Sequence, residues 1–246
     1  MYRKCLSVLT LLVVALPSQA VHAETPEEAI QRGKLIFSDD FNRTEEGDVM
    51  EELGNGWEFK IANGNRADLQ NDTLVITKGE AANHSVSVRH GSPFDDGVVK
   101  LRFQLFDKYG LKLNFNDKQA NKITWAGHIA RVVLQPNKVT IQDDKTGVFD
   151  LNIRAKRQNK NLNEAGKAEL AQFLATKQSV VKAPIELGKW HELTVLIIGP
   201  RFDVYIDGKA VGAFSSEGLD HQVKQYFALG VSGKVAVDDV HAWSLD

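Results

Sequence analysis

Cysteine is almost absent from this chain of 246 residues, in which Cys5 is the single example. An excess of charge of either sign is absent too, because 30 Lys and Arg stand against 32 Asp and Glu, for a net charge of −2. General nucleic-acid binders normally carry a basic excess, so this balance argues against that class. The composition is close to that of an average soluble globular protein, which excludes a collagen, a coiled coil, a disordered tail and a disulfide-stapled miniprotein. No internal repeat or low-complexity tract is present.

Compact catalytic motifs are missing as well. The sequence contains no Gly-rich phosphate loop, no GxSxG, no HExxH and no EF-hand loop. It also lacks the E-x-D-x-E carboxylates of retaining glucanases, whose chemistry needs two carboxyl groups about 5–5.5 Å apart. Any chemistry must therefore come from residues that are scattered along the chain, and no cofactor is required by the sequence.

The first 23 residues have the pattern of a secretory signal peptide. Arg3 and Lys4 give a positive start, Cys5–Leu16 is apolar, and Val21-His22-Ala23 supplies a cleavage site. The apolar segment is too short to span a membrane. Removal of residues 1–23 brings the net charge to −4 and also removes the single cysteine. Without a cysteine, the remaining chain cannot carry out thiol catalysis or bind zinc through cysteine.

An exported protein without cysteine cannot use the disulfides that are common in secreted eukaryotic domains. We therefore expect a bacterial protein of the periplasm or the extracellular medium, with no membrane span in residues 24–246. The sequence does not indicate an oligomeric state.

The rest of the chain is dominated by short alternating segments. In Val99–Leu105 and Leu111–Asn116, apolar and polar residues alternate, as expected for strands with one buried and one exposed face. Asp207-Gly208 lies between two such segments and predicts a type I′ hairpin. Further strands are expected at Lys34–Asp40, Trp57–Asn63, Thr73–Lys78, Ser85–His90, Ile129–Gln135, Lys138–Asp143, His191–Ile198, Phe202–Ile206, Lys209–Phe214, Tyr226–Ser232 and Lys234–Ser244.

The spacing of these segments, about 8–12 residues with turn residues between them, is typical of an all-β protein. We predict a two-sheet antiparallel jelly-roll sandwich that forms a single domain over residues 24–246. Residues 159–182 differ, because their apolar residues recur at helical spacing and Asn163 suits a helix N-cap. They predict one inserted amphipathic helix, which ends before Pro184.

Four pairs of aspartates stand out. Asp95-Asp96 and Asp143-Asp144 are typical of turns, whereas Asp39-Asp40 and Asp238-Asp239 lie in apolar strands. The alternation of Val235 and Val237 changes phase after Asp238-Asp239, which predicts a β-bulge. Terminal strands of jelly rolls usually lie side by side, so Asp39, Asp40, Asp238 and Asp239 could form a structural calcium site. The alternative is edge-strand acids with bulge hydrogen bonds.

Candidate ligand-binding residues are histidines, one arginine and one tryptophan. His128 opens a strand and is the candidate catalytic residue, as a proton shuttle or a partner of a sugar hydroxyl. Arg131 is a candidate ligand-binding residue, although a regular strand would point it away from His128. His84 and His90 share one side of a strand. Trp125 lies in a polar loop, where its ring could stack on a sugar, whereas the other tryptophans are expected in the core.

The closing half of the chain resembles concanavalin A-like jelly rolls. The resemblance rests on Gly188–Leu193, Phe202–Lys209, Gly230 and Val237–Val240. Together with Leu35–Phe41 and Gly56-Trp57, these segments look most like the secreted bacterial 3-keto-disaccharide hydrolase family, formerly a domain of unknown function. The resemblance implies the fold and a carbohydrate partner, and it carries over no catalytic residue.

Two functions from different classes follow. The first is a secreted or periplasmic domain that recognises carbohydrate and binds a glycan on its concave face. The alternative is a glycoside hydrolase of the 3-keto-disaccharide hydrolase type, with His128 or a groove carboxylate as acid or base.

Overall fold

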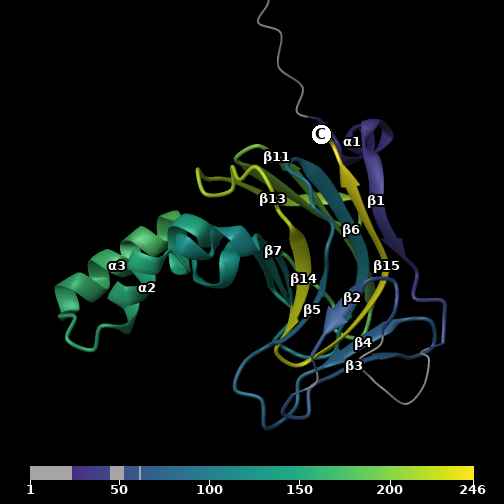
Figure 1. Cartoon of the computed structure of the whole chain (residues 1–246), viewed down its shortest axis with the longest axis horizontal. Helices are drawn as coiled ribbons and strands as arrows, with labels where there is room; N and C mark the ends of the chain where they lie inside the picture. The colour runs from purple at the N-terminus through teal and green to yellow at the C-terminus, as the bar shows by residue number, and fades with distance from the viewer. Residues whose placement is uncertain (1–23, 45–52, 61) are drawn as a thin grey trace, which may run out of the picture.

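The computed structural model describes residues 24–44, 53–60 and 62–246 (Figure 1). The expected signal peptide, residues 1–23, lies outside the described residues. Within them, no helix reaches the length and hydropathy that a membrane-spanning helix needs.

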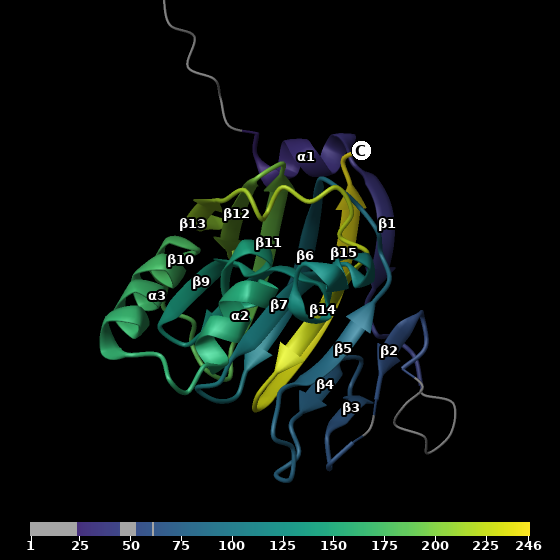
Figure 2. The ribbon, with the colours of Figure 1, turned by 60° about the vertical axis from the view of Figure 1, so that its left-hand side comes forward.

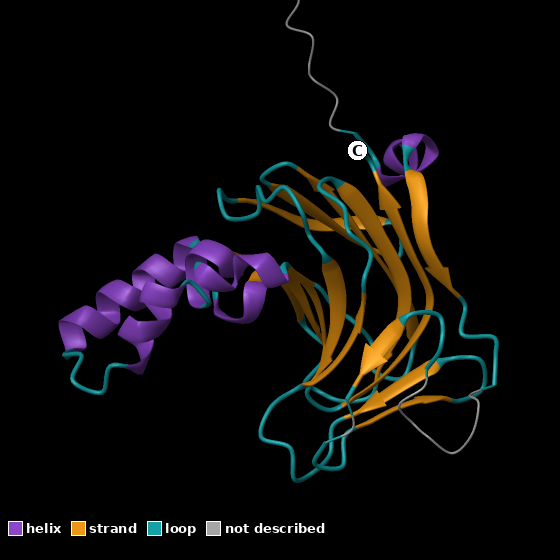
Figure 3. Cartoon of the chain, in the orientation of Figure 1, coloured by secondary structure: helices purple, strands orange, loops and turns teal. Residues whose placement is uncertain are grey.

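All of the described strands belong to two antiparallel sheets that pack face to face, and the chain is an all-β jelly-roll sandwich, as predicted (Figure 3). The first sheet has eight strands in the order β13-β12-β11-β6-β15-β4-β3, with β1 paired to β15. These strands are β1 Lys34–Asp39, β3 Arg66–Leu69, β4 Leu74–Thr77, β6 Gly97–Leu105, β11 Trp190–Ile198, β12 Arg201–Ile206, β13 Lys209–Ser215 and β15 Lys234–Ser244.

The second sheet has seven strands in the order β10-β9-β8-β7-β14-β5-β2. These strands are β2 Trp57–Phe59, β5 Val86–His90, β7 Leu111–Asn116, β8 His128–Gln135, β9 Lys138–Asp143, β10 Gln178–Lys182 and β14 Tyr226–Val231. The apolar residues of the alternating strands meet between the sheets in one hydrophobic core, so the polar residues of β7, β8, β9 and β14 lie on the outer face of the seven-stranded sheet.

Two local predictions are confirmed. Asp207 and Gly208 both have positive φ, 51° and 71°, as a type I′ hairpin requires. The pairing of β15 with β6 shifts register between Asp238 and His241, and Asp239 has φ 47°, so the predicted bulge is present. The bulge bends β15, which pairs with β4 over its first half and with β1 over its second half.

The helical insertion differs from the prediction of one helix over residues 159–182. Two helices are present, α2 Leu151–Gln158 and α3 Glu164–Thr176, and residues 178–182 form the edge strand β10. Asn163 caps α3 as predicted, because its side chain accepts a hydrogen bond from the Gly166 amide. Val180 and Val181 favour an extended backbone, and the edge of β9 offers them a pairing partner.

The insertion lies on the outer side of the seven-stranded sheet. Helices α2 and α3 project from that side in Figure 1 and stand in front of β7 and β9 in the turned view of Figure 2. A third helix, α1 Pro26–Arg32, packs on the outer face of the eight-stranded sheet, where Ala29 contacts Val98 and Leu196. Short helical turns occupy Lys118–Lys122, Trp125–Gly127 and Asp144–Val148.

Candidate functional site

A row of mostly polar residues crosses the outer face of the seven-stranded sheet. Residues that are directly opposite in antiparallel strands point to the same face. The strand register therefore places one such row across all seven strands: Gln178, Gln142, Arg131, Asn114, Ala228, Arg89 and Glu58.

A β-bulge brings His128 onto the same face as Arg131. The pairing of β7 with β8 shifts register between Phe115 and Asn116, so that Asn116 lies opposite His128 and Asn114 lies opposite Arg131. The expectation that Arg131 and His128 point to opposite faces is therefore wrong. That expectation assumed a regular strand. The extra residue of the bulge in β8 changes the alternation, so that both side chains lie on the outer face.

Asp144 lies in a π-type turn at the end of β9, and its side chain is fully buried. The Arg131 Nη2 donates to Asp144 Oδ1 at 2.9 Å. Burial nevertheless raises the pKa of Asp144 to about 6, because loss of solvation outweighs the attraction of the guanidinium. A buried carboxyl group that gains its proton near pH 6 can act both as a hydrogen-bond donor and as an acceptor.

The ring of Phe149 covers both His128 and Arg131. It stacks on the His128 imidazole with ring centres 4.2 Å apart, and the Arg131 Cζ lies 5.0 Å from its centre. Burial, with a smaller contribution from Arg131, lowers the pKa of His128 to about 4. His128 is therefore a neutral imidazole near pH 7, able to accept a proton or a hydrogen bond.

Four polar atoms of this group have no partner. Among the described residues, these are the buried side-chain nitrogen and oxygen atoms that lack a hydrogen bond: Asn116 Oδ1, His128 Nδ1, Arg131 Nε and Asp144 Oδ2. Buried polar atoms in folded proteins are nearly always paired, so their concentration in one place indicates a site built for a polar ligand or for water. We call Asn116, His128, Arg131 and Asp144 the Arg131 cluster.

Asp143, the neighbour of Asp144, has a different role. Its buried carboxylate accepts hydrogen bonds from the Thr146 amide and hydroxyl, the Ser216 hydroxyl and the Gly218 amide. These bonds attach the turn after β9 to the loop after β13. Asp143 is thus an anchor that holds the turn containing Asp144 in place.

Trp125 lies beside the Arg131 cluster, where the sequence predicted a stacking residue. Its indole is 47% exposed, and its backbone amide donates to the Phe149 carbonyl at 2.8 Å. The Arg154 Cζ of α2 lies 3.8 Å from the centre of its ring. The contacts with Phe149 and Arg154 link the β7–β8 loop to the helical insertion and place an exposed aromatic ring at the edge of the site.

Tyr226 continues the aromatic surface on the other side of the cluster, opposite Asn116 in the sheet. The Arg89 Cζ and the Lys118 Nζ lie 5.5 and 5.7 Å from the centre of its ring. A hollow of about 320 Å³ opens here, with Glu58 ion-paired to Arg89 at its wall. Sequence reasoning missed Tyr226 because it opens an ordinary alternating strand.

Sequence reasoning also missed Asp144 and Asn116. Asp143-Asp144 has the pattern of a turn, and the burial of Asp144 depends on Phe149 and on the insertion that follows. One feature of the sequence could have identified Asp144 as a candidate. It directly follows a strand that pairs with the strand of His128 and Arg131.

His84 and His90 do not join the cluster. His90 points inward, where it stacks on Phe37 at 3.6 Å between ring centres and lies close to Trp57. His84 is exposed ahead of β5, and its Nδ1 contacts the Ser85 carbonyl. The expectation that these two histidines share one side of a strand is wrong, because β5 begins at Val86.

The terminal aspartates lie near each other, as β1 pairs with β15. Asp39 is occupied by Arg43, the Trp57 indole and the Phe41 amide, whereas Asp238 and Asp239 contact Arg102. Within the described part of the chain, no three His, Cys, Asp or Glu residues are grouped to hold a metal ion. Calcium bound by these aspartates and Asp40 stays a prediction, which a calcium-dependent shift in Tm tests.

Comparisons with known proteins support the fold. No family model matches the chain, and no curated protein matches it either. Solved structures do. A laminarinase from Flavobacterium sp. UMI-01 is 15% identical with a TM-score of 0.52, and the match covers 86% of this chain and all of that one.

Two further solved structures are similar. An endo-1,3-β-glucanase (laminarinase) catalytic domain from Thermotoga petrophila is 13% identical, with a TM-score of 0.52 over 86% of this chain and 98% of that one. A GlcNAcα1-4Gal-releasing endo-β-galactosidase from Clostridium perfringens is 10% identical, with a TM-score of 0.53 over 94% and 65%. The chain therefore has the concanavalin A-like jelly-roll sandwich fold, and its resemblance to the 3-keto-disaccharide hydrolase family stays a prediction.

Proposed function

We propose that this protein binds a carbohydrate on the outer face of its seven-stranded sheet, over the Arg131 cluster. The observation that carries the proposal is the concentration of unpartnered buried polar atoms in Asn116, His128, Arg131 and Asp144. A sugar hydroxyl both donates and accepts hydrogen bonds, so hydroxyl groups match the Arg131 donor as well as the Asn116 and Asp144 oxygens. Because these atoms are buried, the Phe149 ring must shift for a ligand to reach them.

Aromatic rings on both sides of the cluster, of which Trp125 is exposed and Tyr226 is half-buried, support a sugar ligand. Trp125 lies at one edge and Tyr226 at the other, and the apolar side of a sugar ring packs well on an aromatic face. The sandwich fold is also that of enzymes whose names identify β-glucans and a galactoside as substrates. Polar groups with aromatic walls are the usual composition of small-molecule sites.

A glycan array followed by titration calorimetry tests the proposal. Trp125→Ala and Asn116→Ala should each weaken binding by about tenfold or more, as loss of a central contact does. Phe106→Ala is the matched control, since Phe106 is an exposed aromatic residue at the end of β6 in the other sheet. If Phe106→Ala weakens binding as much as Trp125→Ala does, or if no glycan binds, the proposal is wrong.

Hydrolysis of a glycosidic bond is the second candidate function, and Asp144 favours it. General acids in glycoside hydrolysis are carboxyl groups with raised pKa, and the pKa of Asp144 is raised to about 6. Neutral His128 lies on the same face and could accept a proton. The sequence resemblance adds 3-keto-glycosides to the substrates worth testing.

Product detection separates the two functions. If the protein is a hydrolase, Asp144→Asn should abolish turnover of glycans and 3-keto-glycosides while the variant still binds them. Binding without turnover by the unmodified protein supports recognition alone.

We also propose that the protein is exported, with residues 1–23 as its signal peptide, to the bacterial periplasm or the medium. The charge pattern and the apolar segment that ends before Pro17 support this. Cleavage after Ala23 in a secreting host, read from the N-terminus of the exported protein by mass spectrometry, tests it.

A further inference from the structure

Positive charge collects on the outer face of the seven-stranded sheet, although the whole chain carries a net charge of −2. The strand register places five basic residues on this face and one acidic residue, Glu58. The basic residues are Lys182, Lys138, Arg131, Lys112 and Arg89. Asp144 adds a second acid at the end of β9 and pairs with Arg131, while Glu58 pairs with Arg89.

The lysines of this face have no acidic partner. Among the described residues, Lys112, Lys138 and Lys182 form no ion pair, and the Lys112 amine donates instead to the hydroxyls of Ser85 and Ser232. The outer face of the eight-stranded sheet is more balanced in charge, because three of its basic residues pair with acids, while Arg66 and Lys234 form no ion pair among the described residues. There Lys100 pairs with Glu192, Arg102 with Asp238 and Asp239, and Arg201 with Asp203.

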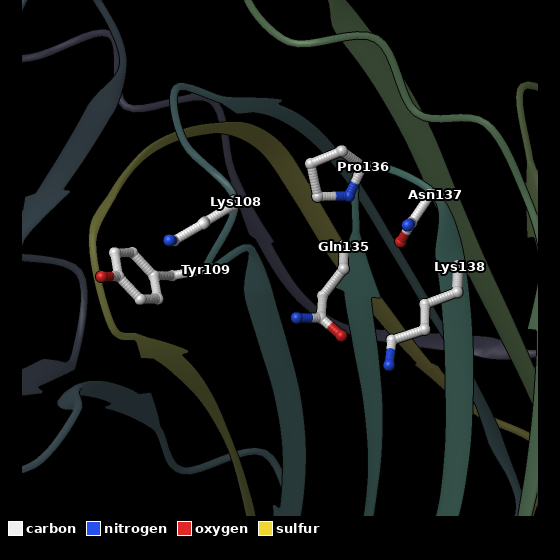
Figure 4. A pocket seen from close by; sticks show the side chains of 6 residues that line it. All are labelled: Lys108, Tyr109, Gln135, Pro136, Asn137 and Lys138. Carbon is white, nitrogen blue, oxygen red and sulfur yellow. The ribbon is translucent and has the colours of Figure 1, made fainter.

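The two hollows near the ends of this face are also basic. One, of about 530 Å³, is lined by Lys108, Tyr109, Gln135 and Lys138 together with Pro136 and Asn137, and it contains no acid. In Figure 4, Gln135 and Lys138 project side by side from neighbouring strands, and the Lys108 amine lies against the exposed Tyr109 ring, 5.5 Å from its centre. The second hollow contains Arg89 and Lys118 against Glu58 alone.

We infer that the ligand of this face is an acidic polysaccharide, a chain of sugars with carboxylate or sulfate groups at intervals, which rests on the proposed carbohydrate binding. Seven strands at about 4.8 Å spacing give a face roughly 29 Å wide. A polymer that crosses it meets Lys118 and Arg89 at one end, Lys112 and Arg131 in the middle, and Lys108 and Lys138 at the other. Aromatic rings accompany the charges, with Tyr226 at one end and Tyr109 at the other.

Unpaired lysines on a sheet face are unfavourable to each other, and repeated anionic groups would relieve their repulsion. A neutral glycan would satisfy the hydrogen bonds of the Arg131 cluster but would leave these charges without counterparts. Salt screens the attraction between the lysines and an anionic ligand, so binding through charge weakens as salt is added, whereas binding through hydrogen bonds does not. Salt dependence therefore distinguishes the two kinds of ligand.

The test is titration of the protein with polygalacturonate and with its carboxyl-reduced neutral form, and with dextran sulfate and dextran, at about 20 and 500 mM salt. At least one acidic polymer should bind tenfold or more tightly than its neutral counterpart and should weaken with salt. Which acidic polymer binds assigns the anion as carboxylate or sulfate.

Charge-matched variants show whether the face itself is responsible. Lys108→Gln with Lys138→Gln should weaken binding of the acidic polymer about three- to tenfold, whereas Lys34→Gln with Lys209→Gln should leave it unchanged. Lys34 and Lys209 are exposed on strands of the other sheet, and both variants remove two positive charges.

Each remaining outcome overturns the inference. Equal binding of acidic and neutral polymers without salt dependence contradicts it but leaves carbohydrate binding intact. An equal effect of the two double variants shows general charge attraction and also contradicts it. Binding of none of the four polymers, together with an array on which no glycan binds, contradicts both this inference and the proposed function.

Discussion

The charge states within the Arg131 cluster are set by burial. Asp144 is fully buried beside Arg131, and His128 lies beneath the ring of Phe149. Burial disfavours the charged form of both groups, so it raises the pKa of the carboxyl to about 6 and lowers that of the imidazole to about 4. Near pH 7 the cluster therefore holds a guanidinium, a carboxylate and a neutral imidazole, and near pH 5 the carboxyl is mostly protonated.

Asp144→Asn should change how stability depends on pH. Because the pKa of Asp144 is raised from 3.8 to about 6, the folded chain keeps a proton that the unfolded chain releases between those pH values. The free energy of unfolding that Asp144 contributes is present below pH 4 and is lost as pH rises through 6. The variant lacks this loss, so its stability relative to the parent should rise by about 2 kcal/mol between pH 4 and 6, and by about 3 kcal/mol over the whole titration.

Urea unfolding of both proteins across this pH range measures the difference. His128 contributes the opposite slope, since its pKa is lowered, but it is present in both proteins and cancels in the comparison. Asp220→Asn, an exposed aspartate, serves as the control. A constant difference between the Asp144→Asn variant and the parent across pH 4–7 would contradict the raised pKa.

At the scale of elements, the site depends on two irregularities that interrupt regular strands. The bulge in β8 brings His128 to the face of Arg131, and the π-type turn after β9 buries Asp144. A strict alternation of buried and exposed residues predicts neither the bulge nor the turn, because it assumes that each residue of a strand lies opposite one residue of the neighbouring strand. The bulge in β15 was predictable, because the apolar phase of Val235 and Val237 changes visibly within the strand itself.

The turn after β9 is held in place by Asp143, and Gly218 lets its carboxylate approach. A Cβ at Gly218 would clash with both Asp143 oxygens. Gly218→Ala should therefore displace the carboxylate, lower the free energy of unfolding by about 1–3 kcal/mol and weaken glycan binding. Gly91→Ala is the control for stability, since a Cβ there has no atom within 4 Å. Equal stability of the two variants would show that Asp143 is not an anchor.

The helical insertion should open more readily than the sheets. Neither α2 nor α3 contains a buried residue, whereas every residue of β7 except Lys112 is buried. Few buried contacts mean a low free energy of local opening. Hydrogen–deuterium exchange should therefore show α3 exchanging well before β7. Equal protection of the two elements would indicate that something covers the insertion in solution.

At the scale of the whole molecule, the sequence predicts the architecture well, because burial repeats every second residue along most strands. The two-sheet sandwich follows from that period and from turn residues, and the adjacency of β1 and β15 follows from the usual place of terminal strands in a jelly roll. The prediction of a single helix over residues 159–182 was wrong, because the large apolar residues of α2, Leu151 and Ile153, are not at helical spacing. The sequence of the short strand β10 also resembles the end of a helix. Of the residues in the candidate site, the sequence singled out Trp125, His128 and Arg131, which the fold brings together, whereas it did not single out Asp144, Asn116 and Tyr226.

The central claim is that a carbohydrate binds over the Arg131 cluster, and NMR of the Arg131 Nε–H signal in labelled protein tests it most directly. This nitrogen is buried and has no hydrogen-bond partner among the residues that the structure describes. Addition of a bound glycan should shift the signal strongly, together with the side-chain amide of Asn116, and leave the Arg102 signal on the other sheet unchanged. A glycan that binds but shifts Arg102 and not Arg131 would contradict the account.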